Sequence, residues 1–435
     1  MIRLLIKELE RLGADDIVMS LHTFTETQIK FVNSVIATTK MWEDTSYRLF
    51  FAYKKRLIST TLQHLTKSNL KATASSLVSF AKALQPKEDY FGIAEGSFNY
   101  KTIRDTYDGS ILDLDSQAPD IVKSAIVAAK PTRLGGVFEY GTGHTHLLTS
   151  NGVDAETRGS SYYLSMRALA AKDASAHEVR AGCMLKHLDA EKAAKDASRT
   201  ALLARDPKGI KLGKYDVVFE PLAFANLLDH VGNAASMFSV EAGLSFLAGK
   251  HGKKVASDKV TIIDDPLIPN GVQSTPFDDE GVPTRRTEII KEGVLKNYLF
   301  NTSLARKHGK RTTGNAGLVC PRPWNVVMKK GKYNKGELLK KTGKGLLITN
   351  LWYTRFQNYL TGQFSTVPRD AIFIIEDGEL KGAVKGIRVS DDLPRMLCSV
   401  VDSSNESRQI MCWETESPVI SPAVSVKDVN ITGSK

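Results

Sequence analysis

The chain has 435 residues, of which 42% are hydrophobic and 25% charged, and this composition is typical of a globular protein. It excludes disordered, collagen-like and coiled-coil chains, and no apolar run reaches the roughly 18–20 residues that span a bilayer. We therefore expect no membrane partner. The N-terminal segment lacks the apolar core of a signal peptide, and the four cysteines are too scattered for a disulfide framework or a Cys-x-x-Cys zinc site. These features predict a cytoplasmic protein.

The net charge of +11 is concentrated in one segment. Residues 303–355 contain 13 Lys or Arg and a single acid, Glu337, so the rest of the chain is close to neutral. Such a segment could bind phosphates or an acidic partner. No nucleic-acid motif surrounds its few aromatic residues, and we interpret it as a solvated surface.

The N-terminal half alternates between helical and strand-like patterns. Apolar residues at helical spacing predict helices over 2–12, 70–84, 116–129 and 189–204, the last capped by Asp189. Strand-like patterns occur over 16–24, 27–39 and 46–53. A further β-region over 137–170 contains Asn151-Gly152, which predicts a hairpin turn.

A segment rich in Lys, Gly and Pro at 205–214 predicts a domain boundary, with a first domain over 1–208 and a second over 209–435. The second domain begins with a strand over 215–219 and a helix that starts near Pro221. Further strands are predicted over 260–263 and 424–431, and hairpins at Glu292-Gly293 and Asp377-Gly378. The predicted fold class is α+β: an N-terminal sheet flanked by helices, followed by a β-rich C-terminal domain.

A search for catalytic motifs is mostly negative. The chain has no P-loop, no dinucleotide fingerprint and no Gly-x-Ser-x-Gly nucleophile elbow. His177-Glu178 and the pair His144 and His146 lack the further ligands that a metal site needs. The acid clusters Asp264-Asp265 and 278–280 could hold a cation or act as an acid/base pair, but Asp beside Pro or Gly is also a common turn former, which we favour.

Several motifs in the C-terminal half resemble a known family. PFDDEGVPTRR, EGVLKNYL, ARKHG and TTGNAG occur in order between residues 260 and 317, and KGLLITNLWYTRFQNYLTGQFS and FIIEDGEL follow. Their order and spacing are similar to those of the TldD/PmbA family, historically called modulators of DNA gyrase. The resemblance covers most of residues 214–435. It implies a protein from a set of paired paralogues, in which one member is a zinc metallopeptidase with His-Glu-x-x-x-His on a helix and a distant Cys.

The other member of such a pair, TldE or PmbA, lacks the zinc ligands. When Val231-Gly232 is aligned with the Val-Gly common in the catalytic motif, the ligand positions hold Leu228, Asp229 and Asn233. Leucine has no lone pair for zinc and asparagine is a poor ligand. Cys398 and Cys412 lie near the expected Cys, but neither matches its position. The resemblance therefore implies a TldE/PmbA-like member without catalytic residues, metal or cofactor of its own, and with zinc in its partner.

The expected function is that of a non-catalytic subunit in a heteromeric zinc metallopeptidase. Its partner would be a catalytic TldD-like paralogue in a heterodimer, and the complex would degrade or trim unstructured peptides, as in peptide maturation. The alternative is a nucleic-acid or gyrase-associated protein that uses residues 303–355, although we expect no nucleic-acid partner. The matched motifs supply candidate peptide-cleft residues, each of which could equally serve turn geometry: Thr284, Arg285, Arg286, Thr313, Gly314, Asn315, Thr361 and Gly362.

Overall fold

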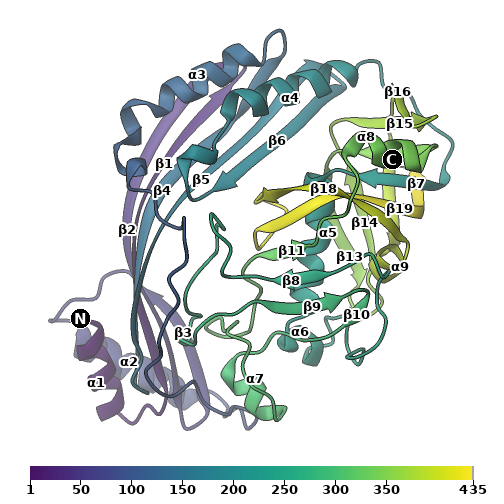
Figure 1. Ribbon diagram of the computed structural model, residues 1–435. Coiled ribbons are helices and arrows are strands. Elements are labelled where there is room, and N and C mark those ends of the chain that lie inside the picture. The colour runs from purple at the N-terminus through teal and green to yellow at the C-terminus, as the bar shows by residue number, and fades with distance from the viewer. Residues whose placement is uncertain (434–435) are drawn as a thin grey trace.

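The computed structural model describes residues 1–433, which form two β-sheets with helices. The first sheet is antiparallel and has the strand order β3-β2-β1-β4-β5-β6. Figure 1 shows its long strands curling around the C-terminal half of the chain. Its strands are β1 Ile17–Val32, β2 Val35–Tyr53, β3 Arg56–Leu62, β4 Arg133–Thr149, β5 Asp154–Ala171 and β6 Ala174–Gly182.

Two pairs of helices cover the outer face of this sheet. In β1 the odd-numbered residues Ile17, Met19, Ile29 and Phe31 pack in the clusters beneath the helices, whereas Val18 belongs to a cluster on the opposite face. The alternation follows from the two-residue period of a strand. The helices are α1 Ile2–Arg11 and α2 Leu70–Ala83 at one end, and α3 Ala118–Ala128 and α4 Ala190–Leu203 at the other, with short 3-10 turns η1 Gly109–Ser116 and η2 Leu185–His187.

The second sheet is built from residues 213–433 and has 13 strands. Its main path is β10-β9-β8-β11-β19-β7-β12-β15-β16, and β19 also pairs with β17 and β18. The strands are β7 Gly213–Phe219, β8 Ile262–Asp264, β9 Thr287–Lys291, β10 Val294–Leu295, β11 Val326–Met328, β12 Gly345–Ile348, β13 Leu351–Asn358, β14 Gln363–Pro368, β15 Ile372–Glu376, β16 Glu379–Ala383, β17 Ile387–Asp392, β18 Val400–Ile410 and β19 Val419–Gly433. The helices of this half are α5 Pro221–Ala234, α6 Met237–Glu241, α7 Thr302–Lys307, α8 Lys335–Thr342 and α9 Leu393–Cys398.

The predicted fold class is confirmed, and so are the long helices and the predicted hairpins. Asp189 caps α4 by accepting a hydrogen bond from the backbone of Lys192 at 2.9 Å. The prediction of one strand over residues 27–39 is wrong. The chain reverses at Asn33-Ser34, where both residues have positive φ, and this turn joins β1 to β2. Along residues 1–433, no helix is both long and apolar enough to cross a membrane.

Two ion clusters join the first sheet to the second. On β6, the Glu178 side chain is 15% exposed and pairs with Arg180 and with Arg408 of β18. Although burial opposes its ionisation, the two guanidinium groups hold the pKa of Glu178 below its usual value. The Asp370 side chain is 1% exposed and pairs with Arg167 of β5 at 2.7 Å. These pairs bridge residues more than 200 positions apart in the chain and fix the two sheets against each other.

The Glu178→Gln substitution tests this linkage. It removes the charge that balances two largely buried guanidinium groups, and we expect the free energy of unfolding to fall by about 2 kcal/mol. Asp120→Asn is the matched control, because Asp120 pairs with Lys123 in solvent, with side-chain exposures of 74% and 66%. We expect this control to change stability by less than about 0.5 kcal/mol. Urea unfolding measures both, and equal effects would contradict the linkage.

Candidate functional site

Helix α5 presents one polar face in an otherwise apolar environment. Pro221 occupies its first turn, where a missing backbone N–H does no harm. Asn226, Asp229 and Asn233 are spaced by three and four residues and therefore share a face. Asn226 and Asp229 are each only 1% exposed. The chain therefore buries a polar stripe at the position where the sequence analysis placed the degenerate zinc motif.

The segment between β18 and β19 closes over this stripe. The backbone N–H of Ser417 donates to Asp229 Oδ1 at 2.9 Å, and Asn233 Nδ2 donates to Asp229 Oδ2 at 3.2 Å. Asn233 Nδ2 also lies 3.3 Å from Glu416 Oε2. Burial raises the pKa of Asp229 to about 7, against the lowering effect of backbone hydrogen bonds from Ser417 and Glu416. Both carboxylate oxygens thus have donors from the chain itself.

The side chains around α5 do not supply the ligands that a zinc ion needs. Leu228 is fully buried in the hydrophobic core. His230 packs edge-to-face against Phe356 with ring centroids 4.7 Å apart, and burial, with a smaller contribution from Arg355, lowers its pKa to about 4. In the part of the chain that the structure describes, no three His, Cys, Asp or Glu side chains converge to hold a metal. A zinc hydrolase needs three protein ligands and an open position.

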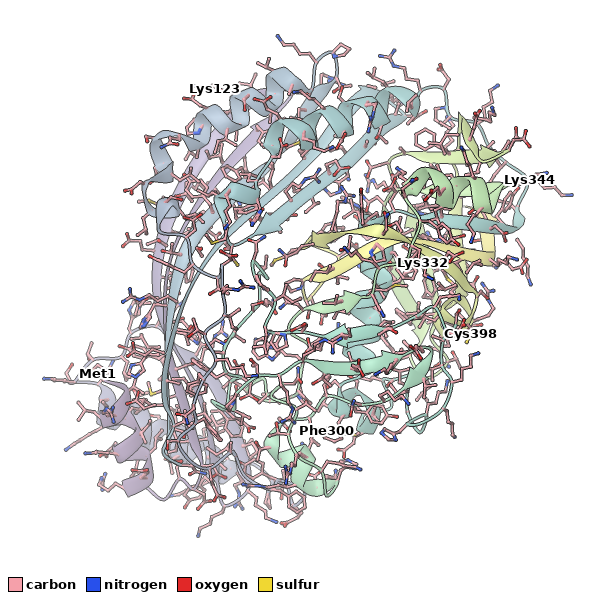
Figure 2. The ribbon with its side chains drawn as sticks, in the orientation of Figure 1. Met1, Lys123, Phe300, Lys332, Lys344 and Cys398 are labelled. Carbon is pink, nitrogen blue, oxygen red and sulfur yellow. The ribbon has the colours of Figure 1, made fainter. Side chains whose placement is uncertain are left out.

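The structure distinguishes the two candidate cysteines by position. Cys412 begins the segment that covers α5, and the Asp229 carboxylate is close enough to act on its thiol. Burial raises the pKa of this thiol. Cys398 ends α9 and is exposed (Figure 2). Of the two, Cys412 is the one placed beside the degenerate motif.

Glu414 ties the covering segment to both α5 and β13. Its carboxylate accepts hydrogen bonds from the backbone N–H of Tyr353 at 2.9 Å and of Thr354 at 3.3 Å, and from Asn226 Nδ2 at 3.2 Å. Tyr353 has a φ of +56°, which is strained for a residue with a bulky side chain. The hydrogen bonds from Tyr353 and Thr354 to Glu414 stabilise this irregular backbone conformation within β13.

An exposed aromatic cluster results beside the polar face of α5. The ring of Trp413 lies 4.9 Å from Trp352 and 5.5 Å from Tyr353, centroid to centroid. Trp413 and Tyr353 are 54% and 47% exposed. The guanidinium groups of Arg167 and Arg369 stack on Trp352. Sequence reasoning missed this cluster, because Trp413 joins the other two rings only through the fold.

The candidate cleft residues fall into separate groups. Arg285, Arg286 and Thr313 are brought together and line an open groove of about 760 Å³. Lys310 and Arg311 line the same groove, so the groove is positively charged. Arg285 donates a hydrogen bond to the backbone carbonyl of Thr312, the residue before Thr313.

The remaining candidates do not line this groove. Asn315 is fully buried and donates from Nδ2 to Asp264 at 2.6 Å, and Thr284 is 5% exposed and donates to the carbonyl of Thr275. Gly314 has a φ of +73°, and a Cβ there would lie 2.7 Å from the Pro283 carbonyl. These three positions therefore serve the packing of the motifs.

Thr361 and Gly362 form the turn between β13 and β14, outside the groove. A Cβ on Gly362 would lie 2.5 Å from Pro394, so glycine is required by the close approach of α9. Thr361 is exposed at the tip of the turn.

In the two acid clusters Asp265 and Asp278 accept local backbone hydrogen bonds, as a turn former does, whereas Asp264 bonds segments distant in sequence. Asp278 accepts backbone hydrogen bonds from Glu280, Val282 and Ala316 at 2.9–3.0 Å. Asp264 accepts from the backbone of Trp324 at 2.6 Å and of Asn325 at 3.1 Å, besides the bond from Asn315.

The basic segment 303–355 does not form one patch. It is divided between α7 at the bottom of Figure 1 and α8 at the upper right, and Lys332 and Lys344 in Figure 2 lie near the latter. Lys307 pairs with Asp89 and Glu241 at 2.8 and 2.9 Å, and Lys341 with Asp402 at 2.7 Å. With Arg306 and Lys335, four of the thirteen cations of the segment are paired with acids of this chain.

Comparison with known proteins gives the family. Residues 212–433 match the family model described as the PmbA/TldA metallopeptidase C-terminal domain, and residues 108–205 match the central domain. The first match covers more than half of the chain, and the chain therefore belongs to the PmbA/TldD family.

Curated relatives include Metalloprotease PmbA of Escherichia coli O157:H7, which is 31% identical over 238 residues, or 55% of this chain and 50% of the relative. A metalloprotease of Methanocaldococcus jannaschii is 33% identical over 215 residues, or 47% of this chain and 46% of the relative. The chain spans about half the length of these two relatives.

Solved structures agree over nearly the whole chain. TldE from Thermococcus kodakarensis has a TM-score of 0.88 at 23% identity and covers 99% of this chain and 100% of its own. A Thermotoga maritima protein described as a candidate modulator of a DNA gyrase has a TM-score of 0.88 at 24% identity, with 99% of each chain covered. At these identities the two likenesses establish the fold alone.

The buried carboxyl of Asp229 predicts a pH effect on stability. Its folded pKa of about 7 lies above the usual value of 3.8, so between these values the folded protein keeps a proton that the unfolded chain has lost. Stability therefore falls as pH rises through this window, by up to about 1.4 kcal/mol per pH unit. Asn cannot ionise, so Asp229→Asn should gain stability relative to the wild type between pH 4 and 8.

Urea unfolding of both proteins across this pH range measures the difference, from which all other titrating groups cancel. Asp258→Asn makes the same chemical change at a side chain that is 70% exposed, and its difference from the wild type should stay flat. A pH-independent difference for Asp229→Asn would show that this carboxyl titrates normally.

Proposed function

We propose that the chain is a cytoplasmic, non-catalytic, TldE/PmbA-like subunit of a heteromeric metallopeptidase that degrades or trims unstructured peptides. The observation that supports the proposal is the environment of Leu228, Asp229 and Asn233 on α5, the positions that the resemblance aligns with the zinc ligands of catalytic family members. Leu228 is packed in the core, and Asp229 is bonded to Asn233 and to the backbone of Ser417. Within residues 1–433 the family scaffold carries no group of three metal-ligating side chains, and this supports a role in which a partner chain binds the zinc.

The aromatic cluster of Trp352, Tyr353 and Trp413 supports a role in binding that partner. Large exposed aromatic side chains flanked by arginine are typical of the energetic centre of protein interfaces. The cluster is joined to the polar face of α5 through Glu414, which bonds Tyr353 and Asn226. A paralogue docked here would lie beside the degenerate motif of this chain.

The basic groove supports a contribution to the peptide cleft. Arg285, Arg286 and Thr313 lie there together with Lys310 and Arg311. Arginine forks bind carboxylates in two-point contacts, and such contacts would suit a peptide C-terminus or acidic side chains.

Co-expression with a catalytic TldD-like paralogue tests the subunit role. We expect a 1:1 complex by size exclusion with light scattering, with chelator-sensitive cleavage of unstructured peptides that neither chain matches alone. Trp413→Ala should weaken the complex at least about tenfold, because a half-exposed aromatic at an interface centre contributes more than 1.4 kcal/mol. Phe80→Ala is the matched control, since Phe80 is 61% exposed on the outer helix α2.

Metal analysis of this chain alone should give no stoichiometric zinc. The subunit role fails if the two chains elute separately at micromolar concentration and the paralogue is fully active alone. The interface assignment fails if Phe80→Ala weakens the complex as much as Trp413→Ala.

The nucleic-acid alternative rests on the basic segment 303–355. The cations of this segment are divided between the α7 and α8 regions, and Lys307 and Lys341 are paired with acids of this chain, so the segment does not offer one continuous track for successive phosphates. We expect duplex DNA to bind more weakly than about 1 μM at roughly 0.15 M salt, measured by fluorescence anisotropy. Tighter binding that is lost when Lys329, Lys330 and Lys332 are changed to Ser would establish the alternative instead.

A further inference from the structure

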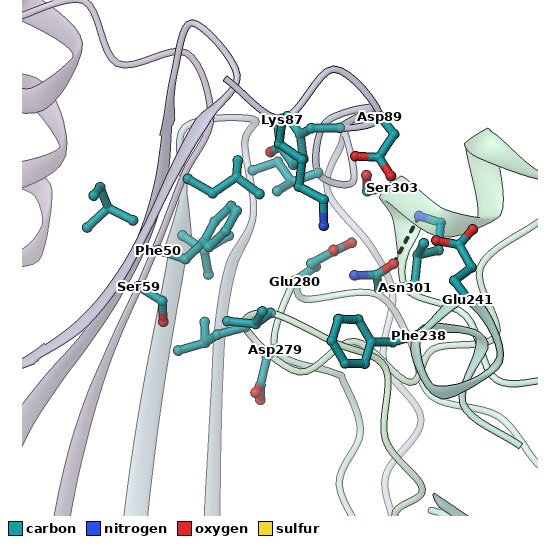
Figure 3. A pocket seen from close by; sticks show the side chains of 18 of the residues that line it. Phe50, Ser59, Lys87, Asp89, Phe238, Glu241, Asp279, Glu280, Asn301 and Ser303 are labelled. Carbon is teal, nitrogen blue, oxygen red and sulfur yellow. Dashed lines mark hydrogen bonds between the residues drawn. The ribbon is translucent and has the colours of Figure 1, made fainter. Parts of the chain in front are cut away.

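A closed-in cavity of about 340 Å³ lies between the inner face of the first sheet and the C-terminal half (Figure 3). It shares no lining residue with the basic groove and none with the polar face of α5. Its volume lies at the lower end of the range for small-molecule sites, so it suits a ligand smaller than a typical cofactor.

One side of the cavity is apolar. Val18 and Phe50 project from the inner face of the sheet and Ile93 from the loop after α2, and all three are at most 6% exposed. Tyr90 also lines this side of the cavity, and its hydroxyl group donates a hydrogen bond to Asp16 at 2.8 Å. Phe238 of α6 faces them from the C-terminal half and is 39% exposed. This wall could take an apolar side chain of about the size of leucine or phenylalanine.

A carboxylate lies at the base of the cavity. Glu280 is 6% exposed, and its Oε2 accepts from the backbone N–H of Thr302 at 3.3 Å. Within residues 1–433 no Lys, Arg or His nitrogen comes within 4.0 Å of it. Burial raises the pKa of Glu280 to about 7, although Thr302 and Arg306 act in the opposite direction. The ionised form of Glu280 therefore has no neutralising cation among the described residues, and a cationic group of a ligand would supply one.

An ammonium group enters the same space from the rim. Figure 3 shows Lys87 pointing down into the cavity above Glu280. Across the described residues, no carboxylate lies within 4.0 Å of Lys87. The other two acids of the rim are already neutralised, because Lys307 bonds both Asp89 and Glu241 at 2.8 and 2.9 Å. Asp279 also lines the cavity, but Figure 3 shows its carboxylate pointing away from Glu280 and Lys87. Between them, Glu280 and Lys87 therefore offer one acidic and one basic group to a ligand.

A simple cation would satisfy Glu280 but face Lys87, and a simple anion would do the reverse. A molecule with both charges and an apolar side chain satisfies every wall. We propose that the cavity binds a small apolar amino acid, whose ammonium group bonds Glu280, whose carboxylate bonds Lys87 and whose side chain packs on Phe50 and Ile93. This inference does not depend on the role as a peptidase subunit.

Isothermal titration of the full chain with L-leucine and L-phenylalanine tests the proposal. We expect a Kd of about 1 mM or tighter for at least one of them. Three probes remove one feature each: 3-methylbutylamine lacks the carboxylate, 4-methylpentanoate lacks the ammonium group, and glycine lacks the side chain. Each should bind at least about tenfold more weakly than leucine. An amine or an acid that binds as well as leucine would overturn the proposal, as would the absence of binding by both amino acids.

Two variants assign the binding to this cavity. Glu280→Gln keeps an acceptor for Thr302 but loses the charge, and Lys87→Met changes an exposed side chain that the fold does not need. Each should weaken binding at least about tenfold, and neither should lower the temperature of thermal unfolding. Glu10→Gln and Lys330→Met make the same changes at exposed positions outside the cavity and should leave affinity unchanged. Equal affinity in all four variants would place the ligand elsewhere and overturn the assignment.

Discussion

The attachment of the curled N-terminal sheet to the C-terminal sheet depends on buried ion pairs. Glu178 reaches Arg408 and Asp370 reaches Arg167, and each pair joins residues that no local pattern could associate. A buried charge is tolerated only when it is compensated, so these contacts allow few relative positions of the two sheets. The cavity above Glu280 exists because of this placement, since its walls come from both halves. So does the stacking of Arg167 on Trp352.

Local physics made much of the fold predictable from sequence. The helices were visible because their apolar residues recur at helical spacing, and Asp189 marked the start of α4 by the chemistry of its cap. The error at residues 27–39 has an equally local cause. The chain turns at Asn33-Ser34, where both residues have positive φ. Asn is often found in this conformation, but Ser is not, so the dipeptide is not a recognisable turn signal. The order of strands in the second sheet was beyond reach, because β19 pairs with strands that lie far from it in sequence.

The candidate site was predictable only where the motif itself supplied the register. Val231-Gly232 aligned the helix, and the structure gives a reason for Gly232, since a Cβ there would lie 2.6 Å from a Val326 methyl group. The roles of Thr284 and Asn315 could not be read in this way. Both belong to family motifs and look exposed in a polar sequence, yet Asn315 bonds Asp264 from 51 residues away. Motif resemblance thus located important residues without separating packing from binding.

Three buried carboxylates of this scaffold are satisfied by hydrogen bonds from the chain itself. The carboxylates of Asp264 and Asp278 accept hydrogen bonds from backbone N–H groups of the motif loops. If these carboxylates coordinated a ligand, the loops would lose the hydrogen bonds that hold them. Asp229 is satisfied in the same way, because its two carboxylate oxygens accept hydrogen bonds from Ser417 and Asn233. A buried acid on this helix without hydrogen-bond donors would carry a desolvation penalty. Closure of the 411–418 segment over α5 removes much of that penalty, and the same closure brings Trp413 against Trp352 and Tyr353 beside the covered polar face.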